Sequence, residues 1–307
     1  MRVVCLSDTH HLFRKVQVPD GDLLLHAGDL SHHGTAAEVR ATADWLRSLP
    51  HRHKVVIGGN HDFCLAEEDH SDLFDGLHYL QDQAVEIEGL RLYGSPWTPE
   101  FGRWPFQMPR GEKAAKIWAN IPDDTQVLLT HGPPAGIGDL TLQAVQAGCE
   151  ALTERVRQVR PLLHLFGHIH EGYGVREQDG TTFVNGACCA VGYLYQQKPH
   201  VFDWDGERFH PVTRWTAGEH LWNFLVERCG APTPILEADW KGELEMGHAF
   251  CVDTSNPTLR FLPARKGDPY PSTPERRPYS FGTKLQLYWF NLLNGHPWPD
   301  RESIPGL

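Results

Sequence analysis

The sequence predicts a layered α/β sandwich followed by a partly irregular C-terminal extension. Three observations support this prediction. Short apolar runs that end in polar turns recur in the first part of the 307 residues, a helix with a clear start signal lies between two of them, and the composition changes near residue 216. Because the chain exceeds the usual size of one domain, we expect a main domain over residues 1–215 and an extension over residues 216–307.

The apolar runs are predicted to be buried strands, since each is continuous and leads into a polar loop that contains Gly or His. In chain order they cover residues 2–10, 22–29, 54–62, 89–95, 126–132, 162–170, 181–187 and 200–206. Between the second and third runs, Thr35 and Glu38 have the spacing of a capping box ahead of apolar residues at helical intervals. Covered strands and a helix together favour a layered α/β sandwich.

The extension differs from the main domain in its proline content. It holds 11 of the 23 prolines, and two amphipathic segments at residues 219–227 and 283–293 flank its proline-rich middle. Disordered tails are poor in aromatic residues, whereas this segment is rich in them. We therefore expect its aromatic side chains to be buried against the main domain or against a second subunit, which leaves a homodimer open.

Composition excludes several classes of function. The net charge is −11, and the chain has no Lys/Arg-rich block, so we expect no extended nucleic-acid footprint. No apolar run is long enough to span a membrane, and the first residues lack the pattern of a signal peptide. Seven cysteines without a CxxC pair favour reduced thiols. These features predict a soluble cytoplasmic protein with no membrane partner.

Residues that can bind metals lie at the ends of five predicted strands. Loops at the carboxyl edge of a sheet converge, so these residues can share one site. Oxygen and nitrogen donors without sulfur suit Mn, Fe, Zn or Ni, and an Asp can bridge two cations, which favours a two-metal centre. The residues able to bind a metal are Asp8, His10, Asp29, Asn60, His61, His131, His168 and His170.

These residues fall into five ordered blocks. The blocks are D-x-H at 8–10, G-D at 28–29, G-N-H-D at 59–62, H-G at 131–132 and G-H-x-H at 167–170. In this pattern the chain resembles the calcineurin-like metallophosphoesterases over about residues 1–210. The amino-acid sequence around the blocks is most similar to the branch of metallophosphoesterase-domain (MPPED) and class III cyclic nucleotide phosphodiesterase-like proteins. The resemblance implies an αββα sandwich.

The resemblance also implies a role for each residue of the blocks. One metal would be bound by Asp8, His10, Asp29 and His170, and the other by Asp29, Asn60, His131 and His168. His61 would assist the leaving group, and Asp62 would be available to orient it. Gly58 and Gly59 would let the backbone turn sharply and let a phosphate approach closely.

The resulting expectation is a phosphoesterase that uses two divalent metal ions and a hydroxide held between them to hydrolyse small phosphodiesters, such as cyclic nucleotides or nucleotide-like diesters. Two alternatives stay open: a phosphomonoesterase or nuclease acting on nucleic-acid ends, and a non-catalytic scaffold with the same fold. The aromatic stretch at residues 95–106 is expected either to pack as a loop or to contact the substrate. His32 and His33 are interpreted as core or surface residues, with substrate contact as the alternative.

Overall fold

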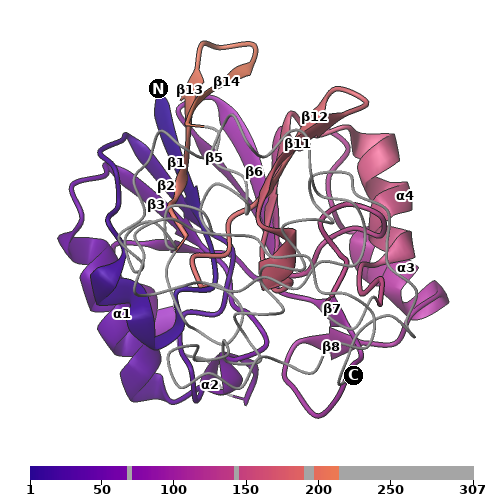
Figure 1. The fold of residues 1–307 in the computed structure, drawn as a ribbon, viewed down its shortest axis with the longest axis horizontal. Coiled ribbons are helices and arrows are strands. Elements are labelled where there is room, and N and C mark those ends of the chain that lie inside the picture. Colours follow the sequence, from indigo (N-terminus) through magenta and orange to yellow (C-terminus); the bar gives the residue numbers. More distant parts are fainter. Residues whose placement is uncertain (68–70, 142–144, 190–196, 214–307) are drawn as a thin grey trace, which may run out of the picture. The chain divides into compact units, whose positions relative to one another are not determined.

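The computed structural model describes residues 1–67, 71–141, 145–189 and 197–213 (Figure 1). Contacts divide the chain into Met1–Thr216 and Ala217–Leu307. The predictions made for residues 216–307, including their buried aromatic side chains, lie outside the described residues, and the boundary at residue 215 stays a prediction.

The first sheet has six strands in the order β14-β13-β1-β2-β3-β4. Strands β1 to β4 are mutually parallel, and β13 and β14 continue the sheet in antiparallel pairs. Their bounds are β1 (Arg2–Leu6), β2 (Leu23–His26), β3 (His53–Val56), β4 (His78–Tyr79), β13 (His200–Trp204) and β14 (Phe209–Thr213).

The second sheet also has six strands, in the order β11-β12-β10-β9-β6-β5. Its four inner strands are parallel, and the edge strands β5 and β11 are antiparallel to their neighbours. The bounds are β5 (Gln83–Ile87), β6 (Leu90–Ser95), β9 (Val127–Thr130), β10 (Leu163–Phe166), β11 (Gly174–Gln178) and β12 (Thr181–Asn185). A separate parallel pair, β7 (Thr98–Pro99) and β8 (Gln107–Met108), lies outside both sheets.

Helices cover the outer faces of the two sheets (Figure 1). Helix α1 (Ala36–Ser48) packs on the first sheet, and α3 (Glu112–Trp118) and α4 (Glu150–Val159) pack on the second. The capping box predicted at the start of α1 is confirmed, because the Thr35 side chain accepts a hydrogen bond from the Glu38 amide and Glu38 accepts one from the Thr35 amide. The short elements are α2 (Phe63–Glu67) and 3-10 helices at His10–Lys15, Ser71–Phe74 and His170–Gly172.

The core between the two sheets follows from alternation along the strands. In β1, Val3 and Cys5 face the second sheet, whereas Val4 and Leu6 face the α1 side. The inner layer also takes Leu129 and Leu165 from β9 and β10. Apolar residues on both faces of a strand are expected where the sheet is covered twice. The predicted αββα sandwich is therefore confirmed.

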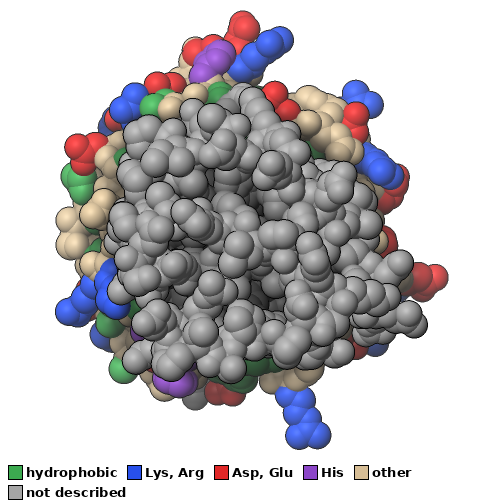
Figure 2. All heavy atoms as spheres, viewed as in Figure 1, with side chains coloured by type: hydrophobic (Ala, Val, Ile, Leu, Met, Phe, Trp, Pro, Cys, Tyr) green, Lys and Arg blue, Asp and Glu red, His purple; other side chains and the backbone are tan. Residues whose placement is uncertain are grey.

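The cysteines, the lengths of the helices and the surface charges bear on the remaining expectations. Cys5, Cys64, Cys149, Cys188 and Cys189 are all free, as predicted for these five cysteines. Within the described ranges, no helix combines the length and apolar composition needed to cross a lipid bilayer. Figure 2 shows basic and acidic side chains interspersed around the rim of the visible face, where neither sign forms a continuous stripe.

Candidate metal centre

The candidate ligands lie in short loops at the carboxyl ends of parallel strands from both sheets. Asp8 follows β1, Asp29 follows β2 and Asn60 follows β3, while His131 and His168 follow β9 and β10 in the second sheet. The two sheets are linked at this edge by a parallel bridge between Ser7 and Ala187, in which the Ser7 amide donates to the Gly186 carbonyl at 2.8 Å. The loops of both sheets therefore meet in one place.

Four of the candidate ligands have a left-handed backbone. The φ angles are 51° at Asp8, 45° at His10, 55° at Asp29 and 64° at His168. Positive φ is uncommon outside glycine and costs about 1–3 kcal/mol per residue, so it persists only where the surrounding structure enforces it. Here the Asp8 amide donates to Gly28 O at 2.9 Å and the His10 amide donates to Asp29 O at 3.0 Å. Backbone strain is thus present at the residues singled out for chemistry.

Asp29 lies between two histidines that come from different loops. Its Oδ1 is 3.3 Å from Nε2 of His131, and its Oδ2 is 3.7 Å from Nε2 of His10. Oδ1 also accepts a hydrogen bond from the His61 amide at 2.8 Å. Because its two oxygens face different imidazoles, this carboxylate has the geometry to contact two cations.

The other buried carboxylate, Asp8, connects the first strand with the G-H-x-H block. Both of its oxygens accept from the His168 amide at 3.1 Å, and Oδ1 is 3.3 Å from His170 Nε2. Asp8 and Asp29 are almost fully buried. Two carboxylates buried in one place are costly unless cationic groups compensate them, so the donor set fits divalent cations.

Two of the histidines are oriented by backbone carbonyls. Nδ1 of His131 donates to Ala27 O at 2.9 Å, and Nδ1 of His10 bonds to Ser31 O at 3.0 Å. These bonds turn both Nε2 atoms toward Asp29, and His131 Nε2 is also 2.9 Å from Asn60 Oδ1. Bonding of one ring nitrogen to a carbonyl while the other faces the ligand position is typical of metal-binding histidines.

The structure groups most of the predicted ligands, with one difference. Within the described residues, one group of donor atoms lying within 4.8 Å of one another comes from Asp8, His10 and His170, and another from Asp8, Asp29 and His131. His168 belongs to neither group; its amide donates to Asp8 and its ring centroid is 5.1 Å from that of His131. The ligand role of His168 therefore stays a prediction.

Burial and charge set the protonation of the centre. Burial lowers the pKa of His10 and of His168 to about 3, so both rings are neutral at pH 7. Burial alone raises the pKa of Asp29, but His131 and His10 outweigh it and hold the pKa well below its usual value. Burial lowers the pKa of His131, but the charge of Asp29 dominates and raises it to about 9. A cation at His131 Nε2 would thus displace a proton.

Two glycines are explained by close packing against these carboxylates. A Cβ at Gly59 would lie 2.3 Å from Asp29 Oδ1, and one at Gly167 would lie 1.9 Å from Asp8 Oδ2. At Gly58 a Cβ would instead lie 3.0 Å from the Phe106 ring. These glycines leave room for a candidate ligand carboxylate and for an aromatic ring, and the close approach of a phosphate expected for the Gly58–Gly59 pair stays a prediction.

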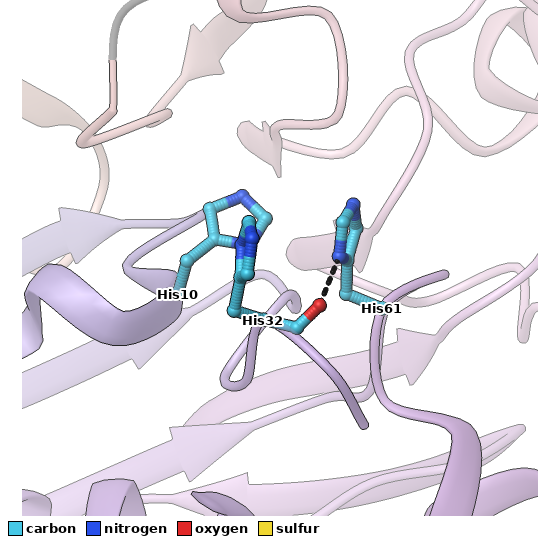
Figure 3. Close-up of side chains that lie close together, drawn as sticks. All are labelled: His10, His32 and His61. Atoms are coloured by element: carbon cyan, nitrogen blue, oxygen red, sulfur yellow. Dashed lines mark hydrogen bonds between the residues drawn. The ribbon is translucent and has the colours of Figure 1, made fainter. Parts of the chain in front are cut away.

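His61 is oriented by a backbone carbonyl (Figure 3). Its Nδ1 donates to the carbonyl oxygen of His32 at 2.8 Å, which turns Nε2 away from the backbone. Its ring centroid is 4.7 Å from that of His10 and 4.7 Å from that of Trp104. The half-buried ring therefore lies beside the candidate ligands, and the donor atoms of His10, His32 and His61 lie within 4.8 Å of one another.

The Asp62 carboxylate bonds to other groups than the His61 ring, which the sequence led us to expect it to orient. Its fully buried carboxylate accepts hydrogen bonds from the amides of Leu30, Ser31 and Gly59 and from the Ser31 hydroxyl, at 2.7–3.1 Å. Consecutive side chains at this turn point to different sides, so Asp62 joins the Asp29 loop to the Asn60 loop. Burial and the charge of Asp29 raise the pKa of Asp62 to about 6.

The comparisons agree with this geometry. A family model described as calcineurin-like phosphoesterase matches residues 1–172. The chain belongs to this family. It is also 41% identical over 229 residues to metallophosphoesterase domain-containing protein 1 of Homo sapiens, covering 66% of this chain and 70% of the relative. It is 25% identical over 216 residues to a probable cyclic nucleotide phosphodiesterase of Synechococcus, covering 68% of this chain and 80% of the relative.

One relative matches more of the chain than its first unit. A probable rhamnogalacturonate lyase C of Emericella nidulans is 42% identical over 293 residues, covering 85% of this chain and 25% of that protein. Residues 1–216 alone cannot supply this share, so the similarity continues into the second unit. Among solved structures, a phosphopantetheinyl hydrolase from Mycobacterium tuberculosis is similar with a TM-score of 0.41 and 15% identity, covering 64% of this chain and 95% of that one.

Sequence reasoning missed two residues that support the centre. Asn185, at the end of β12, donates to Ile169 O at 2.8 Å and accepts from the Ala187 amide at 3.1 Å, which fixes the G-H-x-H loop. Ser31 supplies its carbonyl to His10 and its hydroxyl to Asp62. Asn185 ends a strand and Ser31 lies in the loop after one, but neither is a typical metal ligand. A polar residue followed by glycine at Asn185 was the only available signal.

Proposed function

We propose that the chain is a dinuclear metal-dependent phosphoesterase that hydrolyses phosphodiesters. The observation that carries this proposal is the position of Asp29, whose two oxygens face His10 and His131 from opposite loops. Asp29 would then contact both cations, which are of a kind such as Mn, Fe, Zn or Ni. The remaining ligands would be Asp8, His10 and His170 for one cation and Asn60, His131 and His168 for the other.

When bound, the cations supply Lewis-acid charge at the phosphate and a nucleophile at neutral pH. The protein supplies orientation and proton transfer. Since Nδ1 of His61 is committed to the His32 carbonyl, a second proton on this ring lies on Nε2, from which it can pass to the leaving oxygen. A positioned general acid of this kind contributes roughly 10²–10⁴-fold to the rate.

Asp62 acts here as a positioning residue. It joins the turn that carries Asp29 to the turn that carries Asn60 and His61 through four hydrogen bonds. It therefore sets the distance between a bridging ligand and the proposed acid, although it touches neither the leaving group nor the His61 ring.

The proposed substrate is a small phosphodiester of the nucleotide type. Support comes from the net charge of −11 without a Lys/Arg-rich block in the sequence, and from the distant relative named as a probable cyclic nucleotide phosphodiesterase. The lyase activity in the name of the fungal relative is not carried over, because the chain matches only 25% of that protein.

Metal analysis and a substrate panel test the proposal. The full chain, stripped with a chelator and reloaded with Mn²⁺, is assayed against bis(p-nitrophenyl) phosphate, p-nitrophenyl phosphate and cyclic nucleotides at fixed metal content. We expect about two ions per chain, diester hydrolysis in the reloaded protein and none in the stripped one. Full activity in a verified metal-free sample contradicts the proposal, and no hydrolysis of any ester by loaded protein favours a non-catalytic scaffold.

A pair of neighbouring variants tests the division of roles at residues 60 and 61. His61→Ala should keep both metals, and its rate penalty should be large for an alkyl or nucleoside leaving group and clearly smaller for a nitrophenyl one, which leaves almost unaided. Asn60→Ala is the matched control, because it should weaken one metal and slow all substrates together. Equal penalties across leaving groups for His61→Ala, or loss of a metal in that variant, contradict the role assigned to His61.

A further inference from the structure

Two aromatic side chains are exposed beside the proposed active site. Phe101 is 51% exposed and Trp104 is 37% exposed, and among the described residues only two other large apolar side chains, Val145 and Val212, are exposed to this extent. Scattered apolar residues are normal on a surface, but adjacent exposed rings mark interaction sites. Both rings belong to the loop between β7 and β8.

The base of this loop is firmly held. The Thr98 amide donates to Phe106 O at 2.8 Å, and the Glu100 amide donates to Met108 O at 3.1 Å. Phe106 is buried and its ring packs edge-on against Trp97. The loop therefore closes on a small sheet and a buried ring, and only its tip presents aromatic surface to solvent.

The rings at the tip contact residues of the proposed site on both sides. Trp104 packs on His61, with ring centroids 4.7 Å apart, and on Phe63 at 5.7 Å. Phe101 packs on His168, with ring centroids 5.0 Å apart. Phe101 and Trp104 lie 6.2 Å apart with an angle of 22° between their planes, so they present nearly parallel faces.

A positive charge accompanies these rings. Arg103 lies between them in the sequence and is exposed, and within the part of the chain that the structure describes it forms no ion pair. Its guanidinium can donate hydrogen bonds to an anionic or carbonyl oxygen of a ligand and can also stack on a ring. Flat rings and a cation next to a phosphate site fit a nucleotide better than an alkyl ester.

We propose that Phe101 and Trp104 form a stacking platform that binds the nucleobase of a nucleotide ester whose phosphate occupies the metal centre. This inference rests on the proposed function and names the substrate class for that site. The contact of Trp104 with His61 places the ring on the side of the leaving group. A stacked ring is held through its face, so the platform accepts different bases.

The test compares two probes that differ only in the base. Adenosine 5′-monophosphate and ribose 5-phosphate are titrated into the Mn²⁺-loaded full chain by calorimetry, and the ratio of their dissociation constants measures the base contribution. Trp104→Ala should raise the dissociation constant of adenosine 5′-monophosphate by roughly 5- to 150-fold. The dissociation constant of ribose 5-phosphate should stay within about twofold of the wild-type value. Trp104→Phe keeps a ring and should retain most of the preference. Val212→Ala, another exposed apolar position, is the matched control and should change neither constant.

The outcomes separate this inference from the proposed function. Diester hydrolysis with no preference for the probe that carries a base refutes the platform and leaves the phosphoesterase proposal in place. A base preference that Trp104→Ala removes, in a loaded protein that hydrolyses no ester, supports the platform and contradicts the proposed function. If Trp104→Ala weakens the binding of both probes equally, the platform is also refuted, because the residue then acts on the phosphate site and not on a base.

Discussion

Gly59→Ala offers a sharp test of the centre because it perturbs a ligand without changing one. A Cβ at residue 59 would lie 2.3 Å from both the amide nitrogen and Oδ1 of Asp29, and 2.8 Å from Cε1 of His131. Real Cβ contacts do not fall below 3.0 Å. The Asp29 loop must therefore move by at least about 0.7 Å, and a displacement near 1 Å in an active site costs about 10²-fold in rate.

The assay measures metal content, diester hydrolysis and thermal unfolding on the same preparations. We expect Gly59→Ala to lose at least part of its metal and about 10²-fold in kcat/KM. Gly76→Ala is the control, since a Cβ there would meet nothing within 4 Å, although its φ of 77° makes the residue strained. This control should lower the stability by about 1–2 kcal/mol and leave the metal content unchanged. Wild-type metal affinity and turnover in Gly59→Ala would refute the steric argument.

Three further predictions follow from the same geometry. Asp29→Asn should remove more metal and more activity than His10→Ala, because Asp29 faces both histidines; a milder effect, measured by metal analysis, contradicts its bridging position. Asp62→Asn should lower the free energy of unfolding in urea by about 1–3 kcal/mol, since an amide cannot accept from all the buried donors that face the carboxylate; unchanged stability shows that these bonds do not hold the two turns together. Truncation after residue 215 should expose apolar surface and lower solubility, and a truncated protein as soluble and active as the full chain shows that the extension is dispensable.

The sequence predicted the fold, and it predicted which loops bring the candidate ligands together, because both depend on local signals. A continuous apolar run followed by a polar turn marks a strand covered on both faces, and the capping box at Thr35 and Glu38 marks the start of α1. The short pair β7 and β8 was not predicted, since two-residue strands leave no periodic pattern. The loop that they enclose could therefore be named only as an aromatic stretch.

The roles of individual site residues depend on side-chain direction, which sequence order does not give. Asp62 follows His61 directly, and adjacency suggested a contact between them. In the structure, His61 bonds to the His32 carbonyl, and Asp62 bonds to amides of residues 30, 31 and 59. Gly59 similarly depends on a steric contact with Asp29, a residue from another loop. Contacts of this kind become visible only when the loops are placed in space.

The hydrogen bonds around the two buried carboxylates explain how the strained loops hold one another. The Asp8 carboxylate accepts from the strained His168, and the Asp29 carboxylate accepts from His61. Each carboxylate thus fixes the backbone of another strand end while keeping oxygen lone pairs directed at imidazoles. These amide donors offset part of the cost of burying two negative charges, so the site can take its shape from the protein itself. A candidate ligand set held in this way is preorganised, so a cation that bound there would not need to order the loops first.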